Sequence, residues 1–174
     1  AEAADRFGSQ CIVVAIDAKT VAPAHGHPVD MDGDGDQDVV MAFGIAAAVG
    51  NDSPDSHQVA WYENIGQPGL GTEWKKHAIA PSFPQGFEAV PGDLDGDGDV
   101  DVVMAFGMRG ATTEPNSHQV AWYENAGTAG KGERWEKHLI GKLNYGFEAV
   151  TGDLDGDGDL DVIATGCSGG QPGL

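Results

Sequence analysis

The sequence DLDGDGDVD, residues 93 to 101, is a motif that recurs along the chain, and the other segments lie at similar distances from each copy. Two further copies read DMDGDGDQD at residues 30 to 38 and DLDGDGDLD at residues 153 to 161. Each copy has aspartates at its first, third, fifth, seventh and ninth positions and glycines at its fourth and sixth. The copies begin 63 and 60 residues apart, which predicts a repeated structural unit of about sixty residues.

Aspartates at alternate positions of a glycine-containing loop are the donors that a hard cation requires. Calcium takes about 6–8 oxygen ligands, and Asp-x-Asp-x-Asp-Gly resembles the first half of an EF-hand loop. We expect the first, third and fifth side chains, the seventh backbone carbonyl and the ninth side chain of each copy to bind one calcium ion. The three predicted calcium sites comprise Asp30, Asp32, Asp34, Asp36 and Asp38; Asp93, Asp95, Asp97, Asp99 and Asp101; and Asp153, Asp155, Asp157, Asp159 and Asp161.

An acidic, solvated turn without a metal is the alternative interpretation of one such loop. Three copies in register favour the calcium site over this alternative. The ninth residue must close each site, because the position of the EF-hand's closing glutamate, six residues after the glycine at the sixth position, falls inside an apolar run here.

The composition of the chain limits its partners and its location. Its 174 residues are enough for one core, and 28 acidic residues against nine basic ones give a net charge of −19. Such a charge argues against binding to nucleic acid, whose phosphates it would repel. No apolar run approaches the ~20 residues of a membrane span. Loops of this kind bind calcium where it is plentiful, so we expect a secreted or periplasmic protein.

The segments between the aspartate loops also repeat, and they predict four strands per unit. An apolar run follows each loop, and because it does not alternate with polar residues we expect a strand covered on both faces. An aromatic strand, a partly exposed edge strand and a short strand leading into the next loop complete the unit. In order, these segments are VVMAFG (39–44 and 102–107) with VIATG (162–166), HQVAWYEN (57–64 and 118–125), EWKKHAIA (73–80) with RWEKHLIG (134–141), and GFEAVPGD (86–93) with GFEAVTGD (146–153).

Four short strands per unit, none able to bury its own faces, are typical of a β-propeller blade. The blocks VAWYENxG, WxKHxI and DLDGDGDxDVV resemble the FG-GAP and VCBS repeats, which are calcium-binding blades found in integrin α-subunit propellers and in secreted bacterial proteins. This resemblance implies an all-β fold, a β-propeller of four-stranded antiparallel blades with about seven blades in the ring. It also places the calcium ligands on the aspartates named above.

The chain has about two and a half to three such blades, with repeat units at approximately 11–72, 73–133 and 134–174, the last of them incomplete. We treat residues 1–174 as one partial propeller domain. Either further blades of a longer chain or other copies of this chain would complete the ring. Cys11 and Cys167 lie near opposite ends, and the sequence leaves open whether they form a disulfide or remain as two thiols.

Histidines and aromatic residues are the remaining candidates for chemistry. Four histidines recur at equivalent positions of the units, which favours a structural role: His57, His77, His118 and His138. His25 and His27 are unique to the first unit and are the better candidates for a site. An aromatic set could stack on sugars or fill the space between blades, and the second role is the commoner one: Trp61, Tyr62, Trp122 and Tyr123.

Two functions of different class follow. The first is a non-catalytic, calcium-stabilised propeller segment whose long loops, 45–56 and 108–117, bind a protein or a polysaccharide. The second is part of a carbohydrate-active enzyme, a polysaccharide lyase or sugar dehydratase, because similar repeats build some of these enzymes. That function requires His25 or His27 to meet Tyr145, Glu88 or Glu148 in one pocket. No catalytic motif is evident, so we expect no catalytic residues.

Overall fold

The computed structural model describes residues 29–43, 58–66, 70–81, 88–106, 118–128, 130–143 and 146–166. Several residues named above lie outside this part of the chain: Cys11, Cys167, His25, His27, His57, Tyr145 and both long loops. The described part contains no helix long and apolar enough to span a membrane.

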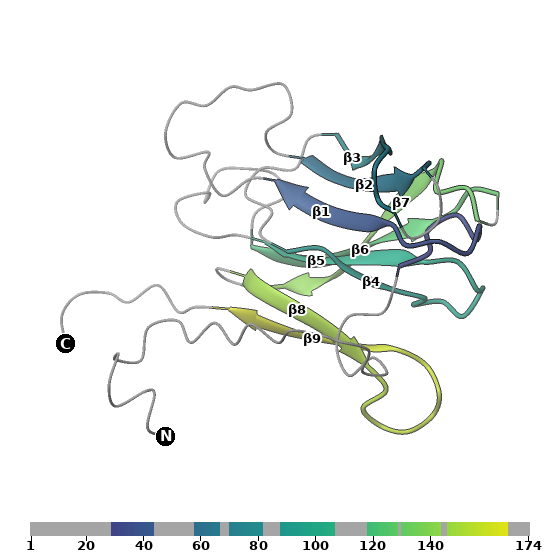
Figure 1. Ribbon diagram of the computed structural model, residues 1–174. Coiled ribbons are helices and arrows are strands. Elements are labelled where there is room, and N and C mark those ends of the chain that lie inside the picture. The colour runs from purple at the N-terminus through teal and green to yellow at the C-terminus, as the bar shows by residue number, and fades with distance from the viewer. Residues whose placement is uncertain are drawn as a thin grey trace, which may run out of the picture.

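The described residues form nine strands in three antiparallel sheets. The first sheet has the order β1-β2-β3, the second β4-β5-β6-β7 and the third β8-β9. The sheets follow one another as successive layers, and the three aspartate loops project from the same side of the stack (Figure 1). The strands are β1 (Val39–Phe43), β2 (Gln58–Asn64), β3 (Trp74–Ala80), β4 (Val90–Gly92), β5 (Asp101–Phe106), β6 (Gln119–Asn125), β7 (Trp135–Lys142), β8 (Gly146–Gly152) and β9 (Asp161–Gly166).

The second sheet is the complete blade that the repeat predicts. Its four strands are neighbours in chain order, and the edge strand β7 lies outermost, as the mixed polar pattern of RWEKHLIG indicates. In the first sheet the bridge between Val29 and Asp38 occupies the place where Gly92 pairs with Asp101 in the second. The third sheet contains the two inner strands of a further blade. The fold is therefore all-β, a partial β-propeller, as predicted.

Strand β5 is covered on both faces because it belongs to the middle layer. Its side chains alternate between the two faces, since the period of a strand is two residues. Val102 and Met104 belong to a core shared with Val59 and Trp61 of the first sheet. Val103 and Ala105 belong to a second core, which includes Ala149 of the third sheet. An unbroken apolar run is therefore required at this strand.

The expectation that all three apolar runs are covered on both faces is wrong for β1 and β9. In β1, Val39 and Met41 are 40% and 42% exposed, although their counterparts in β5, Val102 and Met104, are 0% exposed. In β9, Ile163 is 43% exposed. Among the described residues, the first and third sheets each pack against the second sheet alone, and the opposite face of each carries these exposed side chains. At the equivalent positions of the second sheet, the side chains contact a neighbouring sheet.

The stacking of the sheets predicts different costs for two equivalent substitutions. Met104 and Met41 occupy the same position of the repeat, but Met104 is 0% exposed and Met41 is 42% exposed. Met104→Ala should lower the free energy of unfolding by about 2–5 kcal/mol, because it leaves a cavity between two sheets. Met41→Ala should cost about 1 kcal/mol or less. Urea denaturation of both variants checks this, and equal losses would contradict the layered arrangement.

Candidate metal centres

The first aspartate of each loop organises the turn. In the second loop, one carboxylate oxygen of Asp93 accepts the N–H of Gly96 at 2.9 Å and the other accepts the N–H of Gly98 at 3.1 Å. The equivalent bonds of the first and third loops are 2.7 to 3.1 Å long. Gly96 and Gly98 have φ angles of +75° and +96°, which residues with a side chain rarely adopt. The glycines therefore allow the backbone to wrap around the first carboxylate.

The third and fifth aspartates extend this turn. Asp95 accepts the N–H of Asp97 at 3.2 Å, and Asp97 accepts the N–H of Asp99 at 2.9 Å. The same bonds recur in the other two loops, at 3.0 to 3.3 Å. These side chains cap backbone groups two residues further on, as aspartates in turns commonly do. These bonds are thus common to all three copies, and the first loop adds one more, from the N–H of Asp34 to Asp30 at 3.1 Å.

The ninth aspartate joins the loop to the sheet. One oxygen of Asp101 accepts the N–H of Leu94 in the loop at 2.9 Å, and the other accepts the N–H of Asn125, the last residue of β6, at 2.8 Å. Asp38 makes the same two bonds, to Met31 at 2.8 Å and Asn64 at 2.9 Å. The sequence indicated that the ninth residue closes the loop. It did not indicate the bond to the aromatic strand, which depends on strand order.

Three carboxylates converge in each loop. One oxygen each from the first, third and ninth aspartates lies within 4.8 Å of the other two. The fifth aspartate, which we also expected to contribute its side chain, is not part of this group. The three groups are Asp30, Asp32 and Asp38; Asp93, Asp95 and Asp101; and Asp153, Asp155 and Asp161.

Three aspartates of the first and second loops hold their negative charge at a cost. Burial raises the pKa of Asp101 to about 6, against the opposing effect of its two backbone hydrogen bonds, and the charges of Asp95 and Asp97 raise it further. Burial, then the charge of Asp34, raises the pKa of Asp32, and burial also raises that of Asp38. The ionised carboxylates are therefore destabilised in the folded loop, and a bound cation would reverse this effect.

A turn between β6 and β7 connects the second aspartate loop to the first. The N–H of Gly130 donates to a carboxylate oxygen of Asp99 at 3.1 Å. On its other side, Gly130 lies so close to the first loop that a Cβ would be 2.6 Å from the carbonyl oxygen of Asp32. The indole N–H of Trp61 donates to the carbonyl of Gly132 at 3.3 Å. The turn thus links two loops and two sheets.

The recurring histidines have matching surroundings in two units. The Nε2 atom of His77 lies 2.6 Å from a carboxylate oxygen of Glu63, and the ring stacks on Trp61 with 4.2 Å between ring centroids. The Nε2 atom of His138 lies 2.6 Å from a carboxylate oxygen of Glu124, and the ring stacks on Trp122 with 4.6 Å between ring centroids. Such repetition is what a structural role predicts. Elsewhere, the carbonyl of His118 accepts the N–H of Leu143 at 2.9 Å, which ties the start of the aromatic strand to the end of the edge strand.

The aromatic residues lie mainly between the sheets. Trp61 and Tyr123 are buried in the core that the first and second sheets share, and Trp122 packs against the core between the second and third. Tyr62 is half-buried. This arrangement favours packing over a sugar-binding platform.

The residues suggested for an enzyme are only partly placed. Burial, and then the charge of Glu148, raises the pKa of Glu88, so these two carboxylates interact. They are equivalent repeat positions, and the histidines and tyrosine that the enzyme requires lie outside the described residues. The carbohydrate-active alternative therefore rests on this glutamate pair alone.

Comparison with known families gives one match. A family model described as FG-GAP-like repeat matches residues 30–104 and again residues 106–164. These two segments cover more than half of the chain and contain all three aspartate loops. No solved structure matches the chain.

The contact between Gly132 and Trp61 can be tested against an equivalent glycine. Gly132 and Gly71 have φ angles of +53° and +56°, so alanine costs a similar backbone strain at both, about 1–2 kcal/mol. A Cβ on Gly132 would lie 2.9 Å from the Trp61 indole, whereas one on Gly71 would meet Trp74 at an ordinary 3.4 Å. Gly132→Ala should therefore destabilise the fold by about 1–3 kcal/mol more than Gly71→Ala, measured by urea denaturation. Equal effects would contradict the contact.

Proposed function

The chain belongs to the FG-GAP-like repeat family, and from this premise we propose that it is a non-catalytic, calcium-binding segment of a β-propeller. Each of its three aspartate loops binds one calcium ion. The segment acts as a scaffold for recognition of a protein or a polysaccharide, in a secreted or periplasmic protein.

The convergence of three carboxylate oxygens in every loop is the observation that carries this proposal. All the candidate donors are oxygens, which suits a hard cation, and calcium tolerates the irregular shell that such a loop offers. Magnesium fits less well, because it requires a nearly ideal octahedron at shorter distances and keeps its waters. The raised pKa values of Asp32, Asp38 and Asp101 also favour a site that a cation completes.

Calcium would act here by stabilising the stack. The first and third aspartates would hold the ion, together with the ninth aspartate, whose oxygens also accept an N–H from the loop and an N–H from the aromatic strand. An ion bound only to the folded state adds RT ln(1 + [L]/Kd), about 2.7 kcal/mol per site at a hundredfold excess over Kd. Three sites would therefore contribute much of the stability of a segment this small.

The recognition role rests on the organisation of the repeat. The two long segments, 45–56 and 108–117, are rich in small and polar residues and differ between units, while the strands that flank them are nearly identical. Variable loops on a rigid scaffold commonly carry recognition. Calcium loops of moderate affinity work at extracellular calcium levels, which supports the proposed location.

The open faces of β1 and β9 support a second part of the proposal, namely that further blades of a longer chain cover them. Val39 and Met41 are the counterparts of Val102 and Met104, which contact the preceding sheet, and Ile163 is the counterpart of Val103, which contacts the following one. The open faces therefore carry the same apolar residues that join blades within the segment.

Solution mass distinguishes further blades from association between copies. If further blades of a longer chain complete the ring, light scattering of the 174-residue chain in millimolar calcium should show a monomer or a polydisperse aggregate. A discrete oligomer that dissociates in chelator would contradict this and would show that copies complete one another.

Thermal unfolding of an aspartate variant tests the calcium sites. Asp95→Ala removes a converging carboxylate that is exposed, whereas Asp101→Ala would also break the bonds to Leu94 and Asn125. At a calcium concentration a hundredfold above Kd, Asp95→Ala should lower the free energy of unfolding by about 2.7 kcal/mol, and it should have little effect in chelator.

The control for this variant is Gln37→Ala, an exposed loop position outside the proposed ligand set. It should leave the melting temperature unchanged in both buffers. Loss of stability by Asp95→Ala to the same extent in calcium and in chelator would mean that the second loop holds no calcium.

A further inference from the structure

Two glutamates lie directly opposite each other on the outer strands of the second sheet. In the antiparallel pairing of β6 with β7, Glu124 is the partner of Glu136. Like charges at opposed positions destabilise a sheet. The first sheet avoids this, because Glu63, the counterpart of Glu124, is paired with Lys75 there, and the ammonium lies 3.0 Å from the carboxylate. The second sheet therefore replaces a compensating cation with a second anion.

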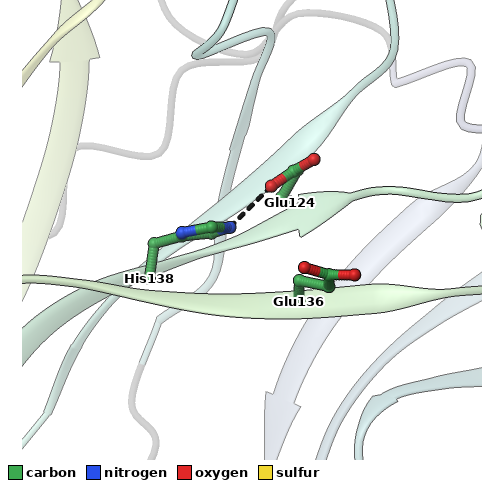
Figure 2. A group of neighbouring side chains, drawn as sticks. All are labelled: Glu124, Glu136 and His138. Atoms are coloured by element: carbon green, nitrogen blue, oxygen red, sulfur yellow. Dashed lines mark hydrogen bonds and ion pairs between the residues drawn. The ribbon is translucent and has the colours of Figure 1, made fainter.

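A histidine completes this group. His138 lies on β7, two residues beyond Glu136, so both side chains are on the same face of the strand. Figure 2 shows its ring directed toward the two carboxylates, with the Nε2 atom 2.6 Å from an oxygen of Glu124. One oxygen of each glutamate and one ring nitrogen lie within 4.8 Å of one another. Stacking on Trp122, at 4.6 Å, fixes the plane of the imidazole.

The ion pair that competes for Glu136 is weak enough for a metal ion to displace. Arg134 lies 3.0 Å from Glu136, but the two side chains are 65% and 53% exposed, and such surface pairs contribute little. Glu124 is 27% exposed and His138 41% exposed, so an ion can reach them from solvent and water can complete its shell. A tetrahedral shell with bonds of about 2.0–2.1 Å needs donors roughly 3.3 Å apart. The nearest atoms of Glu124 and His138 are 2.6 Å apart and would separate slightly, while donor atoms further apart, all within 4.8 Å, would move closer.

From this arrangement we propose that Glu124, Glu136 and His138 form a binding site for one divalent transition-metal ion of the zinc type. Two carboxylate oxygens and one imidazole nitrogen are donors that zinc accepts, with water in the fourth position. The nitrogen donor and the small donor number disfavour calcium, which takes about 6–8 oxygens. The ion would neutralise the opposed glutamates, as Lys75 does for Glu63 in the first sheet. None of the three donors belongs to an aspartate loop.

Isothermal titration with zinc, in millimolar calcium so that the aspartate loops are saturated, tests the proposal on the full untagged chain. We expect one zinc ion per chain at the site, and Glu136→Lys, which reproduces the first unit, should weaken its binding by about tenfold or more. The reciprocal change, Lys75→Glu, places a carboxylate opposite Glu63 and beside His77, and should create a second zinc site of similar affinity.

The two variants test the proposed donor set separately. Both positions are exposed, so neither variant should alter the circular dichroism spectrum, and both should keep the rise in melting temperature that calcium produces. Zinc binding that is unchanged in Glu136→Lys, or absent from the original chain, would overturn the proposal. If Glu136→Lys fails to fold, Lys75→Glu still tests the proposal, because this variant should bind one more zinc ion than the original chain. Binding of no additional zinc would contradict the assigned donor set.

Discussion

The fold depends on one carboxylate in each complete repeat, that of the ninth aspartate. In the second unit, Asp101 is almost fully buried, and its two oxygens accept the N–H groups of Leu94 and Asn125. The first bond closes the aspartate loop, and the second fixes the end of the aromatic strand to the start of the apolar strand. A buried anion with two neutral donors remains under-compensated, as its raised pKa shows, and this is why a cation in the loop would stabilise the sheet as well as the loop.

The packing of the sheets extends this local arrangement to the whole stack. The turn that holds Gly130 and Gly132 contacts the first aspartate loop and the Trp61 indole, while its amide bonds to Asp99 of the second loop. Calcium in one loop would therefore order a turn on which the neighbouring loop and sheet also depend. Because the second sheet contributes alternate residues to two cores, the loss of either neighbouring layer would expose an apolar face on it.

Much of this could be predicted from the sequence, because the aspartate loop and the apolar strand occur three times and the other strand types twice. The strand types, the four-stranded blade and the convergence of Asp93, Asp95 and Asp101 follow from local pattern and spacing. The exposure of Met41 did not follow, because VVMAF is identical in β1 and β5 and only the neighbouring layers differ. The opposition of Glu124 and Glu136 was also missed, since it depends on the register between two strands rather than on either sequence.

Calcium stoichiometry tests the central claim most directly. Equilibrium dialysis of the metal-free chain against calcium, with metal analysis of the protein, should approach three ions per chain as the calcium concentration rises into the millimolar range. Magnesium at the same concentration should displace few of them. Binding of no calcium would contradict the account, because the aspartate loops would then be solvated turns held together by their own hydrogen bonds. Displacement of all the calcium by equimolar magnesium would contradict it as well, because the loops would then not prefer calcium.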